Sequence, residues 1–94
     1  MKPENVNPSN FKVESVLFDN EDFSIAYGKW EGKQNSIAMR WNGYGDDPGY
    51  PKLFSNPVWF LISDDLKIPI IKSLLQLESS NDELILKVLE KELK

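Results

Sequence analysis

Arg40 is the only arginine of the chain, and the stretch from Arg40 to Phe60 holds most of the residues whose types suit recognition. A guanidinium offers a rigid fork of donors for a carboxylate or a phosphate, and arginine and tryptophan are common at the centres of binding surfaces. Because Asp46 and Asp47 follow closely, a second interpretation is an ion pair that fastens the loop to its strand. The two interpretations are compatible, and the local ion pair is favoured.

Oxygen-bearing side chains after Arg40 suggest a metal site or an acid–base pair, but the required patterns are missing. Asn42 precedes Asp46 by four residues, yet the calcium-loop pattern D-x-[DN]-x-[DN]-G with a glutamate at its twelfth position is absent. A glycosidase-type carboxylate pair would need a partner such as Asp64, and nothing in the sequence fixes its separation from Asp46. We expect no metal, no cofactor and no catalytic residue.

The composition excludes several classes of protein. The chain of 94 residues has no cysteine and no histidine, which removes the common transition-metal ligands and the Ser/His and Cys/His nucleophile pairs. The net charge of −4 disfavours nucleic acid and anionic membranes, which bind dense Lys and Arg surfaces. Because neither a signal peptide nor about 20 successive apolar residues are found, we expect a cytoplasmic protein. The missing side chains argue against an enzyme, and the negative charge suits a basic partner.

Aromatic rings alternate with glycine and proline between Arg40 and Phe60, a mixture typical of an ordered loop held by its own side chains. The sequence predicts that Trp41, Trp59 and Phe60 lie in the core. The most exposed part of the loop, which a partner would touch, is then expected to consist of Tyr44, Asp46, Asp47 and Tyr50.

Three stretches before the loop show the two-residue alternation of β-strands: 11–18, 23–30 and 36–42. The polar stretches between them, of which 19–22 is acidic, are predicted to be turns. In the third strand Ile37 and Met39 point to one side and Arg40 to the other. A further short strand is expected within 58–63.

Two helices are expected at the end of the chain. Pro69 has no N–H and would collide with the carbonyl four residues earlier inside a helix, so we place it in the first turn of a helix that runs to about Glu78. Ser80 or Asn81 is the expected N-cap of the second helix. The apolar residues of both helices recur at the three- and four-residue spacing of a buried stripe.

Strands that come first and helices that come last are typical of an α+β domain. We predict an antiparallel sheet of about four strands with two C-terminal helices packed on one face, in a single domain over 11–94. Residues 1–10 are polar and offer nothing to bury, so a mobile or loosely docked polar tail is expected there. One face of the sheet, either the face that carries Ala38 and Arg40 or the opposite one, is a candidate open surface.

Four short groups of residues follow one another in a characteristic order: Arg40 to Gly43, Gly49 to Pro51, Asn56 to Pro57, and Trp59 to Phe60. This order resembles a family of small bacterial single-domain proteins and the immunity proteins of contact-dependent growth inhibition and related polymorphic toxin systems. Where the family pattern has Gly-Asn-Pro, this chain has Ser55 before Asn56, which affects the turn more than the fold. The resemblance implies a cytosolic protein that binds and occludes a toxin, and it carries over no catalytic residue.

Two functional hypotheses follow. The first is a non-catalytic immunity-type inhibitor that binds and neutralises a basic toxin domain, with charge speeding the encounter and aromatic anchors slowing release. The second is a small self-associating scaffold or assembly subunit that dimerises through an open sheet face or edge, so both a monomer and a weak homodimer are compatible with the sequence. The candidate protein-binding residues are Arg40, Tyr44, Asp46, Asp47, Tyr50, Asp19, Glu21 and Asp22.

Overall fold

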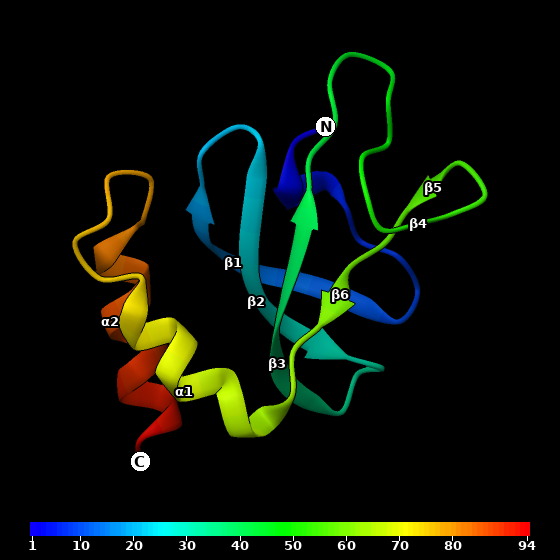
Figure 1. The fold of residues 1–94 in the computed structure, drawn as a ribbon. Helices are drawn as coiled ribbons and strands as arrows, with labels where there is room; N and C mark the ends of the chain where they lie inside the picture. The colour runs from blue at the N-terminus through cyan, green and yellow to red at the C-terminus, as the bar shows by residue number, and fades with distance from the viewer.

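The computed structural model describes the whole chain, Met1–Lys94, and it confirms the α+β class. Three long strands form an antiparallel meander, β1 (Phe11–Asp19), β2 (Phe23–Trp30) and β3 (Gln34–Trp41). The short β6 (Phe60–Leu61) pairs antiparallel with β3 and completes a four-stranded sheet in the order β1-β2-β3-β6. Figure 1 shows the two C-terminal helices lying together on one side of this sheet.

The first helix, α1 (Asp64–Ser73), begins and ends earlier than the sequence pattern predicts. Its N-cap is Ser63, and Pro69 lies in the helix interior instead of the first turn. Pro69 and Asp65 are both exposed, so the carbonyl of Asp65, which lacks its usual donor, can be hydrated. The chain leaves the helix after Ser73 through tight turns, and the predicted extension to about Glu78 is wrong.

The second helix, α2 (Asp82–Glu92), begins as predicted, because the side chain of Asn81 caps it by accepting from the N–H of Leu84 at 3.1 Å. Neither helix is long and apolar enough to cross a bilayer. Both helices pack on the sheet face that carries Ile37, and Arg40 points to the opposite face, which confirms that the two residues lie on different sides. This main core contains Leu17, Ile25, Tyr27, Ile37, Ile71, Leu74, Ile85, Val88 and Leu89.

The opposite face of the sheet is covered and not open. A second cluster of buried residues lies there: Val6, Phe11, Ala26, Ala38 and Trp59. The indole N–H of Trp59 donates to the carbonyl oxygen of Val6 at 2.7 Å, and a short 3-10 turn, Pro3–Asn5, precedes this contact. The expectation that residues 1–10 bury nothing is therefore wrong, because Val6 supplies part of the apolar cover that this face needs.

The chain between β3 and β6 leaves the sheet as a loop followed by a small hairpin. The hairpin consists of β4 (Lys52–Leu53) and β5 (Asn56–Pro57), and it extends on the side away from the helices (Figure 1). The loop first returns to the end of β3, where Trp41 and Tyr50 form an isolated antiparallel bridge. The sequence predicted an ordered loop over this segment but not the hairpin within it.

Candidate functional site

Arg40 lies inside the protein, beneath the loop, with only 1% of its surface exposed. Its Nη1 donates to the carbonyl oxygens of Val58 at 2.5 Å and of Pro51 at 3.4 Å, and its Nη2 donates to the carbonyl oxygen of Pro48. Because three carbonyl groups from different parts of the loop converge on one rigid guanidinium, Arg40 fastens the loop to the sheet from within.

The ion pair that the sequence favoured between Arg40 and Asp46 or Asp47 does not form. Both aspartates are exposed, and Asp47 instead accepts from the N–H of Gly49 at 2.8 Å. The guanidinium points to the second face of the sheet, 5.9 Å from the ring centre of Trp59, and its burial lowers the pKa of Arg40. Arg40 therefore has a structural place and is not available at the surface for a partner.

The position of Arg40 also fixes the base of the hairpin. Pro51 directly precedes β4 and Val58 directly follows β5, so the guanidinium holds both ends of the hairpin, and the N–H of Val58 donates to the carbonyl of Pro51 at 3.1 Å. Gly49 has a φ of +77°, and a Cβ there would collide with the carbonyl of Trp41 and the guanidinium. The loop thus needs glycine at this position to close over Arg40.

Asn42 links the end of β3 to the acidic turn between β1 and β2. It is 3% exposed, and its Nδ2 donates to the carbonyl oxygen of Glu21 at 2.9 Å and to Oδ1 of Asp19 at 3.2 Å. The phenol of Tyr44 then donates to Oδ1 of Asp22, which lies 22 positions earlier. The acidic turn and the loop, two groups of predicted site residues, therefore lie side by side at one end of the sheet.

Exposed apolar side chains concentrate in the same region. Of the eleven large apolar side chains that are exposed, six lie within residues 41–60, namely Trp41, Tyr44, Tyr50, Leu53, Phe54 and Phe60. The prediction that Trp41 and Phe60 lie in the core is wrong, since they are 56% and 64% exposed, whereas Trp59 is buried as predicted. Trp41 belongs to neither core cluster and rests edge-on against Phe23, with the ring centres 4.7 Å apart.

An open hollow of ≈ 600 Å³ lies among these side chains. We call its aromatic and acidic lining the aromatic rim, which consists of Asp22, Trp41, Tyr44, Asp47 and Tyr50. A smaller apolar groove of ≈ 170 Å³ shares Trp41 and Tyr50 with the aromatic rim and continues towards Phe60. Rings that line a concave surface offer both contact area and a shape that a partner can fill.

The carboxylates around the aromatic rim have no partner cation within the chain. The four ion pairs of the structure involve Lys67, Lys87 and Lys91 with carboxylates on β1, α1 and α2. None of them includes the exposed carboxylates of the acidic turn and the loop, which are Asp19, Glu21, Asp22, Asp46 and Asp47. Lys52 is the only cation that lines the same hollow, so this end of the molecule keeps a net negative charge.

The hairpin tip adds two residues that the sequence interpretation did not single out. Phe54 is 95% exposed with a left-handed φ of 58°, and the neighbouring Leu53 is 64% exposed. A bulky residue in this conformation carries backbone strain that no burial offsets here. The only hint in the sequence is a phenylalanine directly before Ser55, Asn56 and Pro57, which are turn-forming residues.

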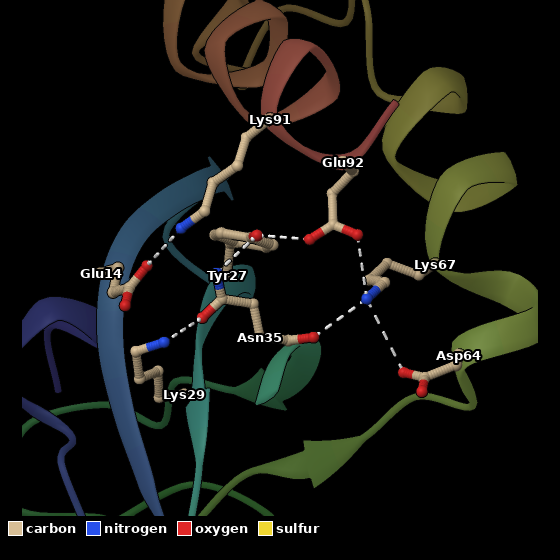
Figure 2. A network of polar contacts seen from close by, with 8 residues as sticks. All are labelled: Glu14, Tyr27, Lys29, Asn35, Asp64, Lys67, Lys91 and Glu92. Atoms are coloured by element: carbon tan, nitrogen blue, oxygen red, sulfur yellow. Dashed lines mark hydrogen bonds and ion pairs between the residues drawn. The ribbon is translucent and has the colours of Figure 1, made fainter. Parts of the chain in front are cut away.

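A second concentration of titratable groups lies towards the other end of β2 (Figure 2). The phenol of Tyr27 donates to Oε2 of Glu92 at 2.5 Å and accepts from Nδ2 of Asn35 at 2.8 Å. Lys67 pairs with Oε1 of Glu92 at 3.1 Å and donates to the carbonyl oxygen of Asn35 at 3.0 Å. We call these four residues, Tyr27, Asn35, Lys67 and Glu92, the polar network.

The electrostatics of the polar network follow from burial and mutual pairing. Burial, together with the hydrogen bond to Glu92, raises the pKa of Tyr27. Burial alone would raise the pKa of Glu92, but hydrogen bonds from Tyr27 and Lys67 outweigh it, and the pKa is lowered. Tyr27 is 2% exposed, and none of the hollows on the surface is lined by a member of the polar network. The network therefore ties the helices to the sheet.

Comparison of the chain with protein-family models, with curated proteins and with solved structures gives no match. The functional argument therefore rests on the geometry of the surface itself. The aromatic rim and the adjoining hairpin are the part of the molecule where exposed rings, unpaired charge and a hollow coincide.

Proposed function

We propose that this chain is a non-catalytic binding protein that recognises a basic partner protein through the aromatic rim and the hairpin tip. In this proposal it acts as an immunity-type inhibitor, which binds and neutralises a basic toxin domain. The observation that carries the proposal is the concentration of exposed rings beside unpaired carboxylates at one end of the sheet.

The exposure of these rings to water is unfavourable, and their burial against a partner is favourable. Each aromatic side chain can bury on the order of 150–250 Å² on contact, and tryptophan and tyrosine are enriched among the residues that dominate binding energy. Trp41, Tyr44 and Tyr50 are all more than half exposed and line one hollow. A protein surface with this lining resembles the central part of an interface surrounded by polar residues.

The buried guanidinium of Arg40 supports the proposal through rigidity. A binding loop that is already ordered loses less conformational entropy when the partner arrives. Arg40 holds the loop and both ends of the hairpin by their carbonyl groups, and Asn42 and Tyr44 attach the loop to the acidic turn. The contact surface is therefore pre-organised although most of it lacks regular secondary structure.

The unpaired carboxylates indicate that the partner's contact surface is positively charged. With a net charge of −4 and five exposed carboxylates free of ion pairs around the aromatic rim, the surface attracts a basic protein over a distance of about one Debye length. Complementary charge speeds association more than it slows dissociation. We therefore expect an association rate that falls steeply as salt is added.

The test is binding to the product of the adjacent gene, followed by growth of cells that express that product with and without this chain. We expect a complex, protection of growth, and an association rate that decreases with salt. Trp41→Ser should weaken binding about tenfold or more, because it removes one of the two rings shared by the hollow and the groove.

The matched control is Leu86→Ser on α2, a position that is 56% exposed and distant from the aromatic rim in the sequence and the fold. It should leave binding unchanged. Absence of a complex, an association rate indifferent to salt, or equal losses from Trp41→Ser and Leu86→Ser would contradict the proposed function.

Self-association as a scaffold or assembly subunit is the second candidate function. It is favoured by two features of the surface: an apolar groove, and the exposed ring of Phe54, which could insert into that groove on a second copy. The sheet face considered for this role is covered by Val6 and Trp59, which leaves the groove, the hairpin and the edges of the sheet. Light scattering on the isolated chain distinguishes the two, because a monomer at every concentration contradicts self-association.

A further inference from the structure

We infer that the aromatic rim is a binding pocket for a single arginine side chain of the partner. This inference rests on the proposed function and adds to it the chemical group that the surface selects. Three rings, those of Trp41, Tyr44 and Tyr50, line the hollow together with the carboxylates of Asp22 and Asp47. Rings attract a cation over their faces, and carboxylates accept its N–H groups.

The backbone places two of the rings on the same side. Trp41 and Tyr50 exchange both hydrogen bonds of an antiparallel pair, with the N–H of Trp41 donating at 2.7 Å and that of Tyr50 at 3.0 Å. Residues directly opposite in such a pair have their Cβ atoms about 5.5 Å apart and pointing to one face. The two side chains therefore form adjacent walls of the hollow.

The third ring is held by a hydrogen bond that also orients a carboxylate. The phenol of Tyr44 donates to Oδ1 of Asp22, which leaves Oδ2 of Asp22 without a donor in the chain. Asp47 likewise has one free carboxylate oxygen, because its Oδ1 accepts from the N–H of Gly49 and its Oδ2 has no donor. Two carboxylates with spare acceptor atoms and no ion pair thus line a hollow walled by rings.

Arginine fits this lining better than lysine does. A guanidinium is planar, stacks on aromatic faces, is weakly hydrated and can donate to two carboxylates from separate edges, whereas an ammonium is a compact and strongly hydrated charge. An apolar side chain would fill the groove next to the hollow but would leave the carboxylates unused. The hollow of ≈ 600 Å³ is open, so a side chain can enter from a partner's surface.

Lys52 lies at the edge of the same hollow and makes no ion pair. Its charge opposes an incoming cation, which leads to an expectation of opposite sign. Removing a carboxylate from the pocket should weaken binding of arginine, and removing Lys52 should strengthen it. General damage to the fold would weaken binding in both cases, so the pair of variants separates charge from misfolding.

The test uses nuclear magnetic resonance of the isotope-labelled full chain with three capped glycine peptides that differ only in the central residue, which is arginine, lysine or citrulline. Citrulline has nearly the shape of arginine but no charge. We expect saturable shifts of the Trp41 indole and of the Gly43 and Gly49 amides with the arginine peptide, at a dissociation constant on the order of 1 mM. The lysine peptide should bind about threefold more weakly, and the citrulline peptide should give no saturable shift.

The variants and an internal reference complete the test. Asp22→Asn should weaken the arginine peptide about threefold, Lys52→Gln should strengthen it about twofold, and Glu90→Gln, an exposed carboxylate on α2 without an ion pair, should change nothing. The buried Trp59 indole should not shift in any titration. Equal binding of arginine and citrulline, equal binding of arginine and lysine, or shifts located elsewhere would overturn the inference.

The two proposals fail in different ways. A chain that binds its basic partner but not the arginine peptide keeps the proposed function and loses this occupant of the hollow. A chain that binds the arginine peptide but no partner keeps the pocket and loses the proposed function.

Discussion

Tyr27 and Tyr44 both donate a hydrogen bond to a carboxylate, but they do so in opposite surroundings. The pair of Tyr27 with Glu92 is largely buried, with the Glu92 side chain 16% exposed, and Lys67 and Asn35 complete it (Figure 2). The pair of Tyr44 with Asp22 lies at the surface, where Tyr44 is 72% exposed and no cation of the chain reaches the carboxylate.

This difference indicates what each region is for. In the polar network every strong donor and acceptor is used within the chain, so its contribution goes to holding the helices on the sheet. Around the aromatic rim, charge and apolar area are both left for something outside the chain. We therefore expect substitutions in the polar network to change stability, and substitutions in the aromatic rim to change binding.

The largest effect is expected at Arg40, the buried residue that holds the loop beneath the aromatic rim by three backbone carbonyls. Arg40→Met should lower the free energy of unfolding by about 3 kcal/mol, because it leaves the carbonyls of Pro48, Pro51 and Val58 without their donor. Urea denaturation measures the loss, and amide exchange of the hairpin should rise. A loss below about 1 kcal/mol would mean that Arg40 does not fasten the loop.

Glu92→Gln should lower the free energy of unfolding by about 2 kcal/mol near neutral pH, since it removes the charge that Lys67 and Tyr27 face. The pKa of Glu92 is depressed from an ordinary value of 4.5. A depressed pKa contributes stability above pH 4.5 that disappears as the pH falls through the folded-state value. Denaturation curves of wild type and variant should therefore converge in acid, and a constant difference across pH would contradict this assignment.

The two tyrosines provide a matched pair. Tyr27→Phe should lower the free energy of unfolding by about 1.5 kcal/mol, because it leaves Glu92 and Asn35 without a buried partner. Tyr44→Phe should lower it by less than about 0.5 kcal/mol, because water replaces the lost contact at the surface. Thermal or urea unfolding measures both, and equal losses would remove the distinction between the two regions.

The smallest effect has the opposite sign. Phe54→Asn should raise the free energy of unfolding by about 0.5 kcal/mol, because asparagine tolerates the left-handed φ of 58° better than phenylalanine does. The same substitution should weaken binding to the basic partner, since it removes the ring at the hairpin tip. If Phe54→Asn instead destabilised the chain, Phe54 would have a packing role that its 95% exposure does not reveal.

Much of the fold could be predicted because it depends on local patterns. The alternation of apolar residues located β1, β2 and β3 and placed Ile37 and Arg40 on opposite sides of the sheet. Ser80 or Asn81 was expected at the start of α2, and Asn81 is the N-cap. The start of α1 was missed because Pro69 was assumed to be excluded from a helix interior. The carbonyl of Asp65, which loses its usual donor to Pro69, is exposed and can be hydrated instead. The burial of Val6 was missed because a single apolar residue in a polar stretch forms no periodic pattern from which burial could be predicted.

The candidate site was predictable in its members more than in its arrangement. Residue types alone pointed to the loop from Arg40 to Phe60 and to the acidic turn, since rings, glycines and carboxylates are unusual together. Tertiary structure decided which of them face solvent. Arg40 turned inward to meet carbonyl groups, and Trp41 and Phe60 were left outside both cores.

The sequence by itself determined the succession of the four sheet strands and the two helices, the acidic charge and the absence of cysteine and histidine chemistry, because these follow from residue types and short-range spacing. Only the tertiary structure decided that Tyr44 lies against Asp22 and that Tyr27 meets Glu92. Those contacts join residues 22 and 65 positions apart, and no local period specifies a pairing over such distances. The packing of the sheet against the helices and the loop brings them together.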